Sequence, residues 1–171
     1  MAAILFFVIA RAPSPPSAAT SVTDGDRIKG PAAALSLYRR TAGGSETLAD
    51  GAIARPGDLV CVGYRSAGPG FGVILSIDDR GIVTMHLPAA GDRAAPLNRG
   101  ATVLLDAAYE LDDAPGWERF YFITGETAFI IAPVADAARR AAGDHRSAPA
   151  ALALPHGLEQ STFSLQKEAR P

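Results

Sequence analysis

Apolar and polar positions alternate most regularly over residues 71–87, and this alternation predicts two β-strands. Between them, residues 78–81 (Asp-Asp-Arg-Gly) suit a tight turn, because Asp can bond its own backbone and Gly accepts a positive φ. We therefore expect a β-hairpin, with His86 on the opposite face from the apolar set. That set comprises Val73, Leu75, Ile77, Val83, Met85 and Leu87.

Similar short segments recur along the chain, with turn signals about every ten residues. Residues 59–66 begin apolar on both faces, which favours a strand between two layers. Residues 117–124 are rich in aromatics and predict a core strand, and residues 160–167 predict a last strand that pairs far back in the sequence. The pattern predicts a mainly β fold, an antiparallel β-sandwich of roughly seven to nine short strands.

One α-helix is predicted in the C-terminal half of the chain. Pro133 suits its first turn, Arg139 and Arg140 suit its last turn, and Gly143 ends it. Its apolar stripe is mostly alanine, so the helix is expected to approach a sheet closely while burying little area.

The first residues differ in composition from the rest. Residues 2–10 (AAILFFVIA) are apolar but shorter than the roughly 20 residues that span a bilayer, and no basic residue precedes them as in a signal peptide. A weak signal sequence, an interfacial anchor and the tail of a transmembrane helix are all open, and we favour the last. Residues 1–10 are thus interpreted as a truncated transmembrane or signal-like segment, 11–26 as a Pro/Ser-rich linker, and 27–168 as a single β-sandwich domain.

Charge and cysteine content exclude several classes of protein. The net charge is −2 and the 16 basic residues are dispersed, so nucleic-acid binding has no electrostatic footprint and is not expected. A single cysteine, Cys61, excludes an internal disulfide and a multi-thiolate zinc site, and we interpret it as a small buried apolar side chain.

Residues 110–118 hold the most suggestive ionisable group, the acids Glu110, Asp112, Asp113 and Glu118. They lack the spacing of a calcium loop. Two interpretations compete: a paired-carboxylate hydrolase that also uses His86, and a solvated loop whose acids cap turns. We favour the loop. The histidines lack a second ligand at metal-binding spacing and no G-x-S-x-G elbow occurs, so we expect no catalytic residues, no metal and no cofactor.

Aromatic and acidic side chains are the best candidates for a binding surface, because an amphipathic ring at the end of a sandwich can hold a ligand. For Trp117 and Tyr121 the favoured alternative is that they complete the core. The candidate binding residues are Tyr64, Tyr109, Asp112, Asp113 and Trp117.

Three segments carry a resemblance to the domain-of-unknown-function family 4384. They are residues 54–88, 97–113 and 118–129, with a Gly-Asp strand entry, the Asp-x-x-Gly turn, and His-Leu-Pro where many members have Phe-Pro. The resemblance implies a sandwich-type module of membrane-anchored or multi-domain bacterial proteins, without accepted catalytic residues. With residues 26–30 and 154–168 added, the chain is similar to the C-terminal extracytoplasmic part of membrane-anchored anti-sigma-factor-like proteins.

These patterns favour a non-enzymatic, extracytoplasmic sensor or interaction module of a membrane-anchored regulator, with an unidentified protein or envelope ligand as its partner. A secreted or cytoplasmic location is the alternative. Two rival functions stay open, the carboxylate- or metal-dependent hydrolase and a structural assembly domain. The first requires three of the acids to converge in one pocket, and the second requires a large exposed apolar patch or a long unpaired strand edge.

Overall fold

The computed structural model describes residues 33–66, 68, 70–113, 116–143 and 148–168. The predicted apolar segment 1–10 and linker 11–26 lie outside these residues. Within the described part of the chain, no helix is long and apolar enough to cross a membrane.

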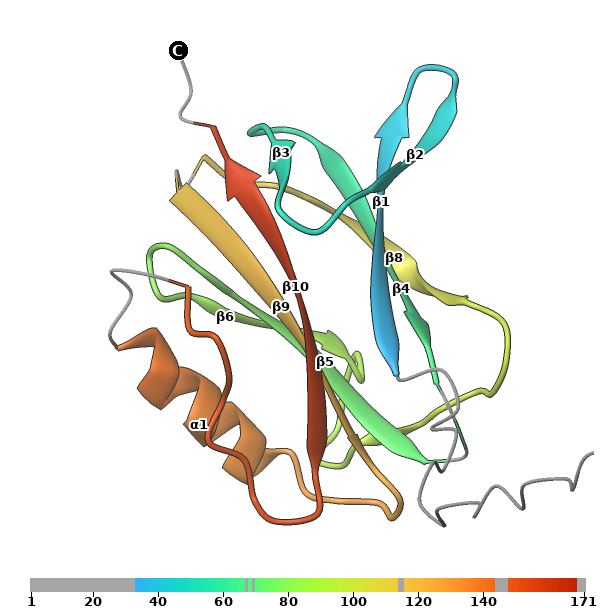
Figure 1. The fold of residues 1–171 in the computed structure, drawn as a ribbon, viewed down its shortest axis with the longest axis vertical. Helices are drawn as coiled ribbons and strands as arrows, with labels where there is room; N and C mark the ends of the chain where they lie inside the picture. Colours follow the sequence, from blue (N-terminus) through green and yellow to red (C-terminus); the bar gives the residue numbers. More distant parts are fainter. Residues whose placement is uncertain (1–32, 67, 69, 114–115, 144–147, 169–171) are drawn as a thin grey trace, which may run out of the picture.

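The described residues form ten strands in two sheets and one helix (Figure 1). The four-stranded sheet has the order β2-β1-β4-β8, and the six-stranded sheet has the order β3-β10-β9-β5-β6, with β7 also beside β5. The strands are β1 (Ala34–Thr41), β2 (Gly44–Leu48), β3 (Ala52–Ala54), β4 (Leu59–Arg65), β5 (Phe71–Asp78), β6 (Val83–Leu87), β7 (Ala95–Pro96), β8 (Val103–Glu110), β9 (Gly116–Gly125) and β10 (Glu159–Lys167), and the helix is α1 (Ala132–Ala142).

The predicted fold class is confirmed: the chain is mainly β, mostly antiparallel, with one helix in its C-terminal half. The strand count exceeds the expected range because β3 and β7 have three and two residues, too few to show alternation. The last strand does pair far back, since β10 lies parallel to β3, with Leu165 opposite Ala52. Its other neighbour is β9, which runs antiparallel to it.

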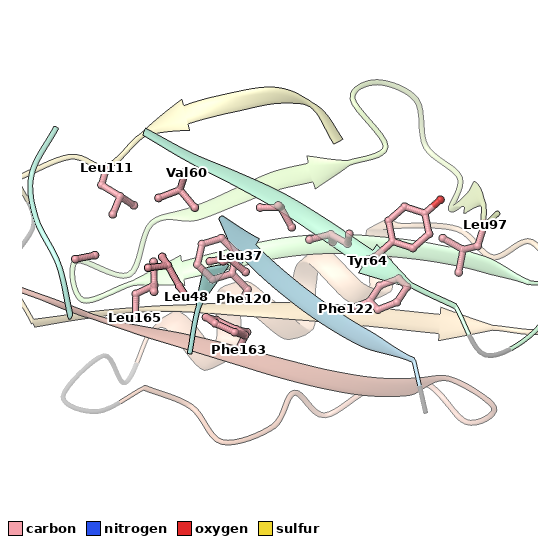
Figure 2. Close-up of a cluster of buried hydrophobic side chains, with 13 residues drawn as sticks. Leu37, Leu48, Val60, Tyr64, Leu97, Leu111, Phe120, Phe122, Phe163 and Leu165 are labelled. Atoms are coloured by element: carbon pink, nitrogen blue, oxygen red, sulfur yellow. The ribbon is translucent and has the colours of Figure 1, made fainter. Parts of the chain in front are cut away.

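The main core fills the space between the two sheets (Figure 2). Strand alternation sends Phe120 and Phe122 of β9 into this core, while Tyr121 and Ile123 point to the other face of the same strand. Both faces of β9 are buried, which explains why its sequence is apolar on both sides. The buried intersheet set is Leu37, Leu48, Ala54, Val60, Val62, Tyr64, Ile74, Leu97, Leu111, Phe120, Phe122, Phe163 and Leu165.

Helix α1 covers the outer face of the six-stranded sheet and forms a third layer (Figure 1). Its first turn contains Pro133, and the chain leaves the helix at Gly143, as predicted. Val134, Ala137 and Ala138 are buried against the sheet, and the small alanine side chains allow the close approach.

One detail of the predicted hairpin is wrong. Leu87 was expected on the face of Val83 and Met85, but it packs against the intersheet core while the other two pack against the helix side. The register explains the difference, because Ile74 pairs with Leu87 and Leu75 pairs with Met85. The extra residue, His86, forms a β-bulge that turns Leu87 to the intersheet face.

Candidate functional site

Two of the five candidate binding residues belong to the core. Tyr64 is 3% exposed, its ring centroid lies 5.5 Å from that of Phe122, and its hydroxyl accepts a hydrogen bond from the Asn98 backbone N–H at 3.3 Å. Trp117 is 9% exposed and packs on the helix side of the six-stranded sheet. The structure therefore places these two on opposite faces of that sheet.

The other three candidates gather where β8 ends and β9 begins. Asp113 Oδ1 accepts a hydrogen bond from Arg80 Nη2 at 2.9 Å, and Asp112 Oδ2 lies 3.9 Å from Arg80 Nη1. Tyr109, by contrast, directs its ring into the space between the sheets, 4.9 Å from His86 and 6.0 Å from Phe120 between ring centroids. The two aspartates are exposed and the tyrosine is not.

Polar side chains enter the intersheet space at this end from five different strands and one loop. We call this group the interlayer polar cluster, and its buried strand positions follow the same alternation as the core: Ser76 follows Ile74 on β5, and Lys167 follows Leu165 on β10. The members of the cluster are Ser76, His86, Tyr109, Asp112, Glu118 and Lys167.

Lys167 is the cation of the interlayer polar cluster. Its side chain is 0% exposed, its ammonium contacts the carboxylate of Asp112, and Nζ lies 3.7 Å from Glu118 Oε2. A buried ammonium is stable only when it is paired and hydrogen-bonded. The carboxylates of Asp112, in the loop after β8, and Glu118, on β9, balance the charge of this ammonium.

Glu118 is buried as well, with 7% of its surface exposed. Burial raises the pKa of its carboxyl, while a hydrogen bond from Ser76 and the charge of Lys167 act in the lowering direction. The balance favours the protonated acid more than in water. Glu118 is therefore suited to hold or pass a proton at its Oε2 atom.

His86 completes a chain of hydrogen bonds through Ser76. Its Nε2 lies 2.9 Å from Ser76 Oγ, and burial lowers the pKa of the ring to about 4. The ring is thus neutral at pH 7. Ser76 thus links the His86 ring to Glu118, with the donor and acceptor roles between Nε2 and Oγ set by the tautomer of the ring.

Tyr109 closes the cluster on the side of the four-stranded sheet. Burial raises the pKa of its hydroxyl well above the usual value. Within the described residues this hydroxyl is one of three buried side-chain polar groups without a hydrogen-bond partner. A buried hydroxyl without a hydrogen-bond partner lowers the stability of the fold. The contacts of the Tyr109 ring with His86 and Phe120 offset this cost and hold the ring in place.

The four acids of the proposed hydrolase do not converge. Asp112 and Glu118 share Lys167, Asp113 pairs with Arg80, and Glu110 is exposed at the end of β8. Among the described residues, no group of three or more His, Cys, Asp or Glu side chains is arranged to hold a metal ion. The region therefore holds one buried lysine between two carboxyl groups.

A groove of about 940 Å³ lies at the other end of the same strands. We call it the end groove, and it is formed where β5 begins, β9 ends and β10 begins. Gly70 permits its shape, because a Cβ there would lie 2.8 Å from the carbonyl oxygen of Gly125. The volume is within the range of sites that enclose small molecules or short peptide segments.

The lining of the end groove is apolar with an acidic rim. Its apolar part includes Leu97, Phe129 and Leu158, and its charged groups are Glu126 and Glu159. His156 is also at the rim, and the described lining contains no lysine or arginine. None of the five candidate binding residues is among the residues that line it.

Sequence reasoning missed the end groove and the role of Lys167. The signal for Lys167 was available, since it continues the inward positions Phe163 and Leu165 at a spacing of two. The groove has no comparable signal, because three separate loops form it. Comparison of the chain with family models, curated proteins and solved structures finds no match. The resemblance to family 4384 stays a prediction.

Proposed function

We propose that this protein is a non-catalytic interaction module that binds its partner in the end groove. The observation that carries the proposal is the groove itself, an open volume with an apolar floor and two rim carboxylates. The wider setting, an extracytoplasmic module of a membrane-anchored regulator, rests on the apolar segment 2–10 and on the family resemblance.

The lining of the groove indicates the class of ligand. Glu126 and Glu159 give it negative charge, and no described lining residue other than His156 can supply a positive one. Leu97, Phe129 and Leu158 offer apolar contact area. A segment that presents apolar and cationic side chains together, such as a short basic peptide of a partner protein, matches both properties.

The rival functions have weaker support. A hydrolase would need its carboxylates free to act on a substrate, whereas Asp112 and Glu118 compensate a buried lysine and Asp113 pairs with Arg80. An assembly domain would use the eight-residue edge strand β8. The register of β8 shifts opposite residues 61–63, which interrupts its row of backbone donors and acceptors and disfavours pairing with another strand.

Fluorescence anisotropy tests the proposal with two labelled peptides, one alternating Leu and Lys and one alternating Leu and Glu. We expect the Leu/Lys peptide to bind and the Leu/Glu peptide not to bind. The double variant Glu126→Gln/Glu159→Gln should weaken binding by roughly three- to tenfold, about 1 kcal/mol. Glu110→Gln, at the opposite end of the fold, should leave it unchanged. Equal binding of both peptides, or no effect of the double variant, contradicts the proposal.

A further inference from the structure

The contact between Lys167 and Asp112 joins a fully buried amine to a carboxyl group from a distant part of the chain. Lys167 is the last residue of β10, and Asp112 lies in the loop that leads from β8 in one sheet to β9 in the other. The two residues are 55 positions apart in the sequence. A second acid, Glu118, lies beside the amine, with Oε2 at 3.7 Å from Nζ.

We propose that Lys167 and Asp112 condense to an intramolecular isopeptide bond, with Glu118 carrying the proton between them. Such a reaction needs an amine, a carboxyl carbon and a proton carrier. Lys167 supplies the amine, and the carboxyl groups of Asp112 and Glu118 both lie beside it. The product would be an amide that fastens the C-terminal strand to the crossover between the sheets.

The reaction balances without any further reagent. Lys167 begins as an ammonium and Asp112 as a carboxylate, and the proton passes from Nζ to the Asp112 carboxyl through Glu118. The neutral Nζ then forms a bond to Cγ of Asp112, and the bond from Cγ to Oδ1 breaks. Oδ1 leaves as water with two of the three ammonium protons, the third stays on the amide nitrogen, and Glu118 returns to its starting state.

The surroundings favour each step of this condensation. The Lys167 side chain is fully buried, which keeps water from the amine, and the half-exposed Asp112 carboxyl gives the released water a way out. Arg80 Nη1 lies 3.9 Å from Asp112 Oδ2, on the oxygen that carries negative charge in the tetrahedral intermediate. The pKa of Glu118 is raised by burial, so this acid can hold the proton in transit.

Intact-mass spectrometry of the purified full chain tests the inference. We expect the protein to be lighter by one water than its sequence requires, and to remain so after treatment with hydroxylamine, which removes a succinimide of the same mass. Trypsin should release residues 100–119 covalently joined to residues 147–171, with Lys167 uncleaved. The second peptide runs to the end of the chain because trypsin does not cut the bond before Pro171.

Four variants assign the bond. Lys167→Arg keeps the cation but cannot condense, Asp112→Ala removes the electrophile, and Glu118→Gln removes the proton carrier, so all three should show the full mass. Asp113→Ala, the matched control, should stay lighter by one water. A wild-type protein that unfolds cooperatively yet has the full mass would hold an ion pair only, and this result overturns the inference. A cross-link between other residues, or a lighter Asp112→Ala or Lys167→Arg variant, overturns it equally, and a lighter Glu118→Gln variant removes the role of Glu118.

Discussion

Ser76 Oγ lies 2.9 Å from His86 Nε2, beside the bulge in β6. In a regular hairpin, Leu87 would lie on the face of Met85, away from His86. The extra residue in β6 places Leu87 beside His86 on the intersheet face, whereas alternation alone already directs His86 toward Ser76 of β5. Strand alternation thus builds the hydrogen-bond chain from His86 through Ser76 to Glu118, and the bulge adds Leu87 to the packing around the ring.

Stability should fall on acidification because of His86. Its pKa is about 4 in the folded protein and 6.5 as the ordinary value, so the unfolded chain binds more protons between these limits. The free energy of unfolding should therefore decrease as the pH falls from 6.5 to 4, by up to about 3 kcal/mol from this residue. Urea unfolding at a series of pH values measures the change.

Exposed His156 provides the matched control for this effect. Glu118 changes the pH dependence of stability in the direction opposite to His86. Because the pKa of Glu118 is raised in the folded state, its contribution grows as the pH falls through that pKa. The loss should therefore appear as a difference between the wild type and His86→Gln, and not between the wild type and His156→Gln. Equal pH profiles for the wild type and His86→Gln would show that the ring titrates normally in the folded protein.

Leu75 tests the helix side of the hairpin. It is 0% exposed and packs in the layer between β5 and α1. Leu75→Ala should lower the free energy of unfolding by about 2–5 kcal/mol, because it removes buried area and leaves a cavity. Thr84→Ala on the neighbouring strand, whose side chain is exposed, should cost less than 1 kcal/mol. Similar losses for both variants would mean that the assigned faces of the hairpin are wrong.

Gly72 tests how tightly the intersheet core is packed. A Cβ at this position would lie 2.8 Å from Leu97 Cδ2 and 2.9 Å from Phe122 Cε2. Gly72→Ala should thus destabilise the fold by about 1–3 kcal/mol through overpacking. Gly43 has no atom within 4 Å of such a Cβ, so Gly43→Ala provides the control in thermal unfolding. A Gly72→Ala variant as stable as the control would contradict this packing.

Tyr121 fastens the segment before β10 to the sheet. Its hydroxyl donates to the Pro149 carbonyl at 2.6 Å, and Arg119 Nη1 donates to the same oxygen at 3.0 Å. Tyr121→Phe should cost about 1 kcal/mol and raise hydrogen exchange near residues 148–152. A loss confined to global stability, with unchanged exchange in that segment, would speak against this role.

The predictable elements of the structure are those whose apolar residues recur at the regular spacing of a strand or a helix. Alternation identified β5, β6, β9 and β10, and the capping pattern around Pro133 and Gly143 identified α1. The bulge at His86 was not predictable, because it depends on which residues of β5 pair with β6. Alternation also predicted which strand positions face inward, yet Lys167, at such a position, was not interpreted as buried.

The candidate site was less predictable than the fold for a physical reason. The core alternative given for Trp117 and Tyr121 agrees with their burial, whereas Tyr64, predicted only as a binding residue, is buried as well. The end groove arises where Ser66, Gly68 and Gly70 meet residues 124–130 and 155–159, and these loops have no periodicity that would predict that they lie close together. Ion pairing between Lys167 and Asp112 likewise depends on long-range topology.

Chemical-shift mapping of the full chain with the Leu/Lys peptide tests the central claim most directly, because it locates the binding surface. We predict that the largest amide shifts on titration occur at the end groove, in Thr124, Gly125, Thr127 and Leu158. Amides of β2 and of the loop around Asp112, at other parts of the fold, should not move. Shifts centred on those regions, or no shifts at all, would contradict the assignment of the end groove as the interaction site.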